Sequence, residues 1–282
     1  MKITRFIIDE LKSAGFNMAA DLYLLDQCEN SDIVTVRFYS WMRPSITLGY
    51  MQNASLELDL DAVKRAGVDW IKRPTGGRAV LHDGDITYSC IFPRSISEMG
   101  SGITQTYRLI TECLLNGLDR ASIKCDAHDS SSELKGLERT VKLPCFLAPN
   151  RDEIMVSGKK LVGSAQKRNA NAVLQHGSIP ITSNCFKLPE YLRINGEEKE
   201  KQIKLLREKS SFIHEWIPGA AFGAIIQHLM DGFSSILPFK CEVRGWSGQE
   251  ETAINKMALE DDFIKRWKSS NSQVIKSEGK AR

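Results

Sequence analysis

Apolar residues recur along most of the chain at spacings that distinguish helices from strands. Apolar positions three and four apart predict helices at 18–28, 58–67, 103–119 and 219–236. Runs of β-branched and aromatic residues predict strands at 33–39, 45–50, 69–73 and 86–92. Asn17 is the expected N-cap of the first helix, because its side chain can accept a hydrogen bond from a free backbone N–H.

The second half of the chain changes character twice. Residues 153–181 alternate short β segments with glycine-containing turns, such as Ser157-Gly158, which predicts a β-meander. After Pro189 the pattern is mainly helical. We expect the polar stretch 126–142 to be a mobile loop and the basic tail from about residue 270 to be disordered.

Strands and helices are therefore mixed over the first two thirds of the chain. A doubly wound nucleotide-binding sheet would show regular βαβ alternation and an early Gly-x-Gly-x-x-Gly, and the sequence has neither. The expected class is α+β, with a mixed sheet flanked by helices.

Composition narrows the class of protein without identifying it. The 282 residues are 42% hydrophobic and 26% charged, which excludes a disordered chain or a fibre. The net charge of +3 is too small to indicate nucleic-acid binding. No window approaches the roughly 18–20 apolar residues of a membrane span, and the first residues do not form a signal peptide. We therefore expect a cytoplasmic protein without a membrane anchor.

The seven cysteines contain no Cys-x-x-Cys pair, so neither a zinc site nor a disulfide framework is expected. Free cysteines are usually buried filler. Cys145 differs because Pro144 and Pro149 bracket it in a rigid, non-helical segment shortly before a lysine-bearing hairpin. A thiolate is a strong nucleophile, and a nearby lysine or histidine can lower the pKa of its thiol.

The segment Arg73-Pro74-Thr75-Gly76-Gly77-Arg78 follows a predicted strand and leads to His82-Asp83. A Gly-Gly pair allows a ligand to approach the backbone closely, and the two arginines can bind a phosphate or a carbonyl oxygen. The alternative is a tight turn between strands with solvated arginines.

A second segment, Lys160-Leu161-Val162-Gly163-Ser164-Ala165, places a lysine on a strand before small residues. Such a lysine can serve as a cation, or as a base when burial lowers its pKa. The alternative is a hairpin with an exposed Lys159-Lys160 pair. His176, in Leu174–Ser178, either lines the same pocket or is a structural histidine of the sheet.

These segments resemble those of a known superfamily. RPTGGRAVLHD (73–83) and GKKLVGSAQKR (158–168) are similar to the two signatures of the lipoate–protein ligase and octanoyltransferase superfamily. LQHGSI (174–179), NMAAD (17–21) and SITLGYMQ (45–52) also match, so the resemblance covers about residues 1–245. Cys145-Phe146-Leu147-Ala148-Pro149 resembles the Cys-Phe-x-x-Pro segment of LipM-type octanoyltransferases. The chain departs from that pattern after Pro149, where Asn150-Arg151-Asp152 replaces serine and an aromatic residue.

The resemblance implies mixed, mainly antiparallel β-sheets flanked by helices, as in the catalytic domain of biotin and lipoate protein ligases. It implies a catalytic domain over 1–245, followed over 246–282 by a helix and the basic tail. The implied reaction moves an octanoyl group from acyl carrier protein to a lysine of a lipoyl-domain protein, such as the glycine-cleavage H protein. No cofactor and no metal are implied, and we expect a monomer.

The resemblance also assigns roles to residues. Cys145 is the implied nucleophile that carries the acyl group as a thioester, and Lys160 is the implied base. The implied binding residues are Arg73, Thr75, Gly76, Gly77, Arg78, His82, Gly163, Ser164, Ala165 and His176.

Four other functions remain open at this stage. An ATP-dependent lipoate–protein ligase would use Arg73, Gly76, Gly77 and Lys160 to hold an acyl-adenylate, and Cys145 would be incidental. An amidotransferase would move the octanoyl group between two lipoyl domains through the same cysteine. A degenerate acyl-binding module would bind without transfer. A nucleic-acid binder has little support from the small net charge.

Overall fold

The computed structural model describes residues 2–29, 31–128, 146, 153–260, 263 and 266–267. The strands are β1 (Ile3–Lys12), β2 (Ile33–Trp41), β3 (Ser45–Leu48), β4 (Asp69–Lys72), β5 (Val80–His82), β6 (Asp85–Pro93), β7 (Asp126–His128), β8 (Glu153–Val156), β9 (Lys159–Arg168), β10 (Ala172–Pro180) and β11 (Lys240–Val243). The helices are α1 (Ala14–Gln27), α2 (Ala54–Glu57), α3 (Leu60–Arg65), α4 (Ile103–Arg120), α5 (Gly196–Lys209), α6 (Ile213–Trp216), α7 (Phe222–Ile236) and α8 (Gly248–Leu259), with 3-10 helices η1 (Ser97–Met99) and η4 (Ser183–Tyr191).

Within the described residues, one large sheet has the strand order β11-β1-β2-β6-β10-β9-β8-β7. Strand β1 pairs in parallel with β2 and β11, and α1 crosses between β1 and β2. The strands from β2 through β6, β10, β9 and β8 to β7 pair in antiparallel fashion. The predicted α+β class, with mixed, mainly antiparallel sheets flanked by helices, is therefore confirmed.

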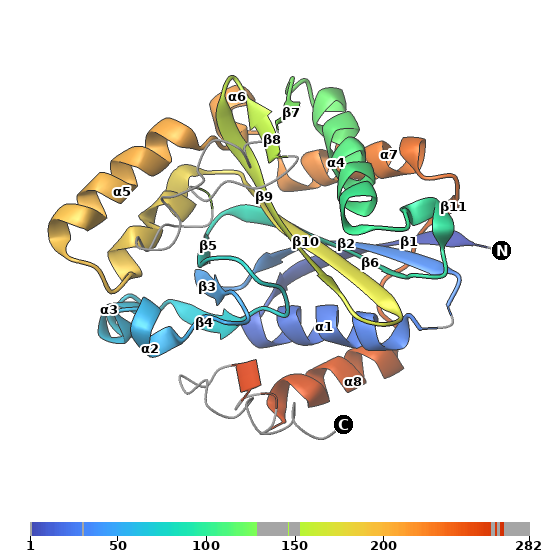
Figure 1. Ribbon diagram of the computed structural model, residues 1–282, viewed down its shortest axis with the longest axis horizontal. Helices are drawn as coiled ribbons and strands as arrows, with labels where there is room; N and C mark the ends of the chain where they lie inside the picture. The colour runs from blue at the N-terminus through green and yellow to red at the C-terminus, as the bar shows by residue number, and fades with distance from the viewer. Residues whose placement is uncertain are drawn as a thin grey trace.

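The large sheet is covered by helices on both faces (Figure 1). Helices α4 and α7 cover one face, where Val34, Val36 and Phe38 of β2 join the main hydrophobic core. Helix α1 covers the other face, and α8 packs on its far side (Figure 1). Because side chains alternate along a strand, the intervening residues of β2 point toward α1. They include Arg37, Tyr39 and Trp41, which become part of the site described below.

A smaller sheet, β4-β3-β5, lies beside the large one and carries the glycine-rich segment at its edge. Strand β3 pairs in parallel with β4 and in antiparallel fashion with β5. Its core is a separate apolar cluster that includes Ile46, Leu48, Leu58 and Leu81. Residues 73–79 therefore connect β4 and β5, the two strands that flank β3, and cross over one end of β3.

The predicted β-meander is confirmed as β8, β9 and β10. Ser157 and Gly158 have φ values of 47° and 77° and form the two-residue turn between β8 and β9. Positive φ at both central residues is the geometry that matches the twist of a hairpin. This turn fixes the register that places Lys160 opposite Met155.

Several local predictions are wrong. Helix α1 begins four residues earlier than predicted, because Ser13 rather than Asn17 is its N-cap and accepts from the backbone N–H of Phe16. Asn17 lies inside the helix and is fully buried. Strands β1 and β11 and the short helix α2 were not predicted, whereas the short helix expected over 58–67 is confirmed as α3.

Most of the polar stretch 126–142 and the tail from residue 270 lie outside the described residues. Among the residues that are described, no helix has the length and apolar character needed to cross a membrane.

Helix α8 is fixed to the first strand by an ion pair. Ser247 and Glu250 form a capping box at the N-terminus of α8. Both oxygens of the Glu250 carboxylate also accept from Arg5, at 2.7 and 2.9 Å. These hydrogen bonds from Arg5 hold the pKa of Glu250 at about 2.

We expect Glu250→Gln to lower the free energy of unfolding by about 1–2 kcal/mol at neutral pH, because solvent partly screens the pair. A carboxyl group whose pKa is depressed on folding stabilises the protein above its unfolded pKa. The difference between the two proteins should therefore disappear as the pH falls from about 4.5 to 2. Urea unfolding at several pH values measures it. Glu251→Gln, which breaks a more exposed pair with Lys12, is the control and should cost less than about 1 kcal/mol.

Candidate active site

A pocket lies between the two sheets and α1. It is lined by Met18, Tyr39, Trp41, Thr47, Arg73, Val80, His82, Thr87, Gly163, Ser164, Ala165, His176, Gly177 and Ser178. The structure thus brings together residues from α1, β2, β3, β5, β6, β9 and β10. Six of the residues that the sequence suggested for binding are in this wall: Arg73, His82, Gly163, Ser164, Ala165 and His176.

A first network of hydrogen-bonded side chains in the wall runs from Arg73 through Thr75 and His176 to Asp21. His176 Nδ1 lies 3.2 Å from a carboxylate oxygen of Asp21, and its Nε2 lies 2.7 Å from Thr75 Oγ1. A carboxylate only accepts, so Nδ1–H donates to Asp21 and Nε2 of the neutral ring accepts from the Thr75 hydroxyl. Arg73 Nε in turn donates to Thr75 Oγ1 at 3.2 Å.

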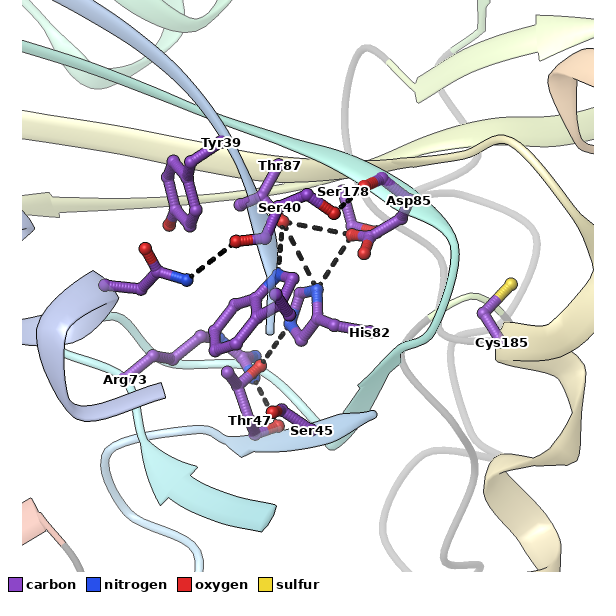
Figure 2. Close-up of polar contacts among 12 residues, drawn as sticks. Tyr39, Ser40, Ser45, Thr47, Arg73, His82, Asp85, Thr87, Ser178 and Cys185 are labelled. Carbon is purple, nitrogen blue, oxygen red and sulfur yellow. Dashed lines mark hydrogen bonds and ion pairs between the residues drawn. The ribbon is translucent and has the colours of Figure 1, made fainter. Parts of the chain in front are cut away.

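A second hydrogen-bond network of the same kind runs from Thr47 through His82 to Asp85 (Figure 2). His82 Nδ1 lies 2.8 Å from Asp85 Oδ2, and its Nε2 lies 2.9 Å from Thr47 Oγ1. Asp85 Oδ2 also accepts from Thr87 and Ser178, at 3.0 and 2.6 Å. The sequence suggested Asp83 as the neighbour of His82. The carboxylate bonded to His82 is thus Asp85 at the start of β6.

Arg73 contacts both hydrogen-bond networks and also bonds to the backbone of the glycine-rich segment. Besides Thr75, its guanidinium donates to the carbonyl oxygens of Thr47, Gly76 and Arg78, at 3.0, 2.8 and 2.8 Å. These bonds use the Nε, Nη1 and Nη2 groups of a fork that has five donors. Arg73 lines the pocket, but its guanidinium is bonded to backbone carbonyl oxygens. We therefore infer that Arg73 holds the glycine-rich loop in shape and does not bind a phosphate.

The buried charges determine the protonation of the first network. Burial lowers the pKa of His176 below its usual value despite the opposing effect of Asp21, so the ring is neutral at neutral pH. Burial alone would raise the pKa of Asp21, but the hydrogen bond from His176 and the charge of Arg37 outweigh it, and the pKa is lowered. Asp21 is therefore an anion that keeps His176 in one tautomer.

Arg37 is the fully buried cation behind Asp21. Its Nε donates to Asp9 at 2.5 Å and its Nη1 donates to Asp21 at 3.1 Å. Its remaining donors reach the backbone and side chain of Asn17, and its guanidinium lies 3.8 Å from the ring centre of Tyr39. Asn17 and Asp21 are four residues apart on α1, so both face this one strand residue.

The cavity wall is largely apolar despite its polar residues. Trp41 stacks on the His82 ring at 4.2 Å between centroids and donates its indole N–H to Thr87. The polar atoms of the histidines and threonines bond to one another, as described above. Their carbon atoms, with the side chains of Met18 and Val80, are therefore left to face the cavity.

The Gly76-Gly77 loop packs against the chain itself. A Cβ atom on Gly49 would lie 2.0 Å from the carbonyl oxygen of Gly77, so the two segments touch backbone to backbone. Gly77 has a φ of 95°, which favours glycine, whereas the space around Gly76 is open. Gly76 and Gly77 are exposed at the rim, and Thr75 is buried.

Lys160 lies on β9 three residues before Gly163, about 10 Å along the strand. It is buried, and its Nζ donates to Glu153 Oε1 at 2.5 Å. Its Nζ is also 5.9 Å from the ring centre of Phe146, and the same ring lies next to Gly163. The alternative of a hairpin with an exposed Lys159-Lys160 pair is therefore excluded for Lys160. Cys145, the predicted nucleophile, lies outside the described residues.

Sequence analysis missed several residues of this site. Asp21 and Asn17 are polar residues in an otherwise apolar helix, which was an available signal of buried pairing. Trp41, Thr47 and Glu153 gave no signal, because their roles depend on pairings between strands that are far apart in the sequence.

Comparison with known proteins agrees with this architecture. Residues 13–234 match the model of the lipoyl protein ligase A/B catalytic domain. Octanoyltransferase LipM of Kyrpidia tusciae is 35% identical over 253 residues, which are 87% of this chain and 92% of that protein. Octanoyltransferase LipM of Halalkalibacterium halodurans is 31% identical, over 95% of this chain and 99% of that protein.

Solved structures show the same fold. A lipoate-protein ligase A bound with ATP superposes with a TM-score of 0.73 and 23% identity, over 92% of this chain and 94% of that chain. The bipartite lipoate protein ligase from Thermoplasma acidophilum gives a TM-score of 0.75 and 22% identity, over 92% of both chains.

The fold and these comparisons thus define a lipoyl ligase or transferase domain. The chain belongs to the lipoyl protein ligase A/B catalytic-domain family. The resemblance predicted from the sequence motifs is confirmed, including its LipM-type relatives.

We expect Arg37→Met to lower the free energy of unfolding by about 3–5 kcal/mol, because it leaves Asp9 and Asp21 buried without a cation. Denaturation in urea measures the change. Lys12→Met is the control: it breaks an ion pair that is partly exposed, and at most about 1 kcal/mol should be lost. Equal costs for the two variants would contradict the central role of Arg37.

We expect Gly49→Ala to cost about 1–3 kcal/mol, because its methyl group would overlap the Gly77 carbonyl oxygen and displace the loop. Gly76→Ala should change stability by less than about 0.5 kcal/mol, since nothing lies within 4 Å of the added atom. Thermal unfolding of both variants tests the difference. If Gly76→Ala were destabilised and Gly49→Ala were as stable as wild type, the close contact between Gly49 and the Gly77 carbonyl oxygen would be contradicted.

Proposed function

We propose that this chain is an octanoyltransferase of protein lipoylation that works through a cysteine thioester. The octanoyl group would move from acyl carrier protein to Cys145, and then to a lysine of a lipoyl-domain protein such as the glycine-cleavage H protein. The observation that carries the proposal is a mostly apolar pocket lined in part by β9, the strand that also carries Lys160. The histidines of its wall are hydrogen-bonded to threonines. LipM-type relatives at 31–37% identity support the same activity.

An eight-carbon acyl chain suits this cavity. Burying its seven carbons beyond the carbonyl at ~0.8 kcal/mol each contributes about 5 kcal/mol of binding free energy. The wall offers ring and methyl surfaces from Trp41, Met18 and Val80. Because the histidines and threonines already have partners, an apolar chain leaves none of them without a hydrogen bond.

The choice of Cys145 is supported by the residues around it in the sequence and by the other cysteines. Phe146, the next residue in the chain, contacts the strand that carries Lys160. Burial raises the pKa of Cys28 to about 11 and that of Cys125 to about 12. It also raises the pKa values of the Cys90, Cys113 and Cys185 thiols well above their usual range. Such thiols are poor nucleophiles at neutral pH.

The remaining chemistry follows from the thioester. Attack of the Cys145 thiolate on the substrate carbonyl creates an oxyanion, which needs positioned donors. The backbone N–H groups of Gly76 and Gly77 are our candidates, because this loop is exposed at the rim while Gly163 and Ser164 belong to the β9–β10 ladder. The bond energy stays in the thioester, so the reaction needs neither ATP nor another cofactor.

The proposed enzyme is a cytoplasmic monomer that meets two protein partners in turn. The Thermoplasma acidophilum ligase was solved in work that also describes its E2 lipoyl domain, which supports a lipoyl domain as the acceptor class.

Intact-mass spectrometry tests the proposal. Wild-type protein incubated with octanoyl acyl carrier protein should gain the mass of one octanoyl group, and Cys145→Ala should gain none. The wild type should then transfer the group to a lipoyl-domain protein without ATP, while Cys145→Ala loses all detectable transfer.

Cys185→Ala is the control, because this buried thiol joins neither hydrogen-bond network of the site and should leave the adduct unchanged (Figure 2). An enzyme that forms no adduct and needs ATP with free lipoate would instead be a ligase, and the proposal would be wrong.

A further inference from the structure

Asp9 is a buried carboxylate on β1 that contacts two distant parts of the protein. Its Oδ2 accepts from Arg37 Nε at 2.5 Å, and its Oδ1 accepts from the indole N–H of Trp246 at 2.7 Å. Trp246 follows β11 and is far along the chain from the residues that line the pocket. The contact therefore joins a late, half-buried side chain to the buried charge of Arg37.

The segment that carries Trp246 is held against β1 and α1. From β1, Arg5 donates to the carbonyl oxygens of Arg244 and Gly245, at 3.0 and 2.5 Å. From α1, the ring of Phe16 packs edge-on against the Trp246 ring, with 6.3 Å between their centres. These contacts fix both the backbone before the indole and the plane of its ring, so the direction of the N–H is fixed as well.

Asp9 lies at an irregularity of its strand. The register between β1 and β2 shifts between Ile8 and Leu11, so Asp9 is inside the shifted stretch. A bulge of this kind disrupts the local pairing and re-aims the side chains that it carries. We therefore infer that the hydrogen bonds with Arg37 and Trp246, more than the strand pairing, set the position of this carboxylate.

Arg37 transmits this position toward the pocket. Its bond to Asp21 is longer than its bond to Asp9, at 3.1 against 2.5 Å. Without the N–H of Trp246, one oxygen of the buried Asp9 carboxylate would have no donor, which is unfavourable. The carboxylate would then draw Arg37 more strongly, and the longer bond to Asp21 would be the first to weaken.

Asp21 connects this change to the pocket wall. His176 donates to Asp21 from Nδ1 and accepts from the Thr75 hydroxyl at Nε2. An Asp21 that is less compensated by Arg37 favours a second proton on the His176 ring. A protonated ring donates from both nitrogens, so it could no longer accept from Thr75. The Thr75 hydroxyl, which also accepts from Arg73, would have to turn at the base of the glycine-rich loop.

We propose that Trp246 is a positioning residue for the acyl pocket. Its N–H holds Asp9 so that Arg37 stays shared between two carboxylates. This sharing keeps His176 neutral and the glycine-rich loop in its observed shape. Trp246 itself does not line the pocket and acts through the buried ion pairs. The inference rests on the function proposed above only where activity is measured.

The protonation of the His176 ring gives the direct test. Nitrogen-15 NMR of the imidazole rings follows it in the free protein as the pH is lowered. Trp246→Phe keeps an aromatic ring but removes the N–H, and it should raise the pKa of His176 from its lowered wild-type value. The titratable or charged groups that act on His176 are Asp21, Arg73 and His82. Of these, Asp21 bonds to Arg37, so the shift reports on that bond.

Two controls separate this path from a general effect on the fold. His82 lines the same pocket but bonds to Asp85, so its signals should shift far less in Trp246→Phe. Trp216→Phe is the matched variant, because it also removes one indole N–H, which donates to Ser211 at 2.8 Å near α6. It should leave the titration of both histidines unchanged.

Octanoyl transfer from acyl carrier protein to a lipoyl-domain protein is the second readout. In Trp246→Phe the rate should fall about tenfold near pH 6, because groups that position a substrate are displaced. It should recover toward the wild-type rate near about pH 8, where the His176 ring is neutral again. Trp216→Phe should follow the wild type at both pH values.

Two results would overturn the inference. One is a Trp246→Phe protein in which His176 titrates as in the wild type. The other is a loss of transfer that is absent or is the same at every pH, since a merely structural role predicts no pH dependence. A wild type that forms no octanoyl adduct would instead overturn the proposed function, and the titration of His176 would still decide the role of Trp246.

Discussion

A guanidinium group with no access to water is the constraint on which the site depends. Arg37 must have its charge compensated, because an isolated buried cation is very costly. Asp9 and Asp21 compensate it, and their positions fix β1 and α1 relative to β2. Asp21 then fixes the tautomer of His176, which bonds to Thr75, and Thr75 is bonded to Arg73. The shape of the glycine-rich loop is thus set by a charge that lies in another layer of the protein.

The same logic explains how a cavity lined by histidine, threonine and arginine can accept a hydrocarbon chain. A polar atom makes a surface hydrophilic only when its hydrogen-bonding capacity is unmet. Thr47 and Thr75 occupy the Nε2 atoms of His82 and His176, and the two aspartates occupy the Nδ1 atoms. Each imidazole ring is hydrogen-bonded at both of its nitrogens, so rotating the ring would break a hydrogen bond. The wall is therefore rigid as well as apolar.

Sequence alone predicted the parts of the structure that depend on local patterns. The hairpin at Ser157-Gly158 follows from the needs of a tight turn, and the α+β class follows from the alternation of periodicities. The glycine and lysine segments were found because their motifs are local as well. The bond between His82 and Asp85 was not predicted, because it depends on how β5 and β6 meet. Glu153 could not be predicted to pair with Lys160, because a register shift between β8 and β9 determines which face each residue occupies.

The buried carboxylates of this region differ in the groups that donate hydrogen bonds to them. Asp21 accepts from Arg37, Tyr39, Ser89 and His176, and Asp85 accepts from His82, Thr87 and Ser178. The hydrogen bond from His176 and the charge of Arg37 keep the pKa of Asp21 below its usual value despite burial, so this carboxylate is a poor proton acceptor. Glu153 accepts from the buried ammonium group of Lys160, at 2.5 Å. The hydrogen bonds and ion pairs of Asp21 and Asp85 thus hold α1, β2, β5, β6 and β10 in place around the pocket.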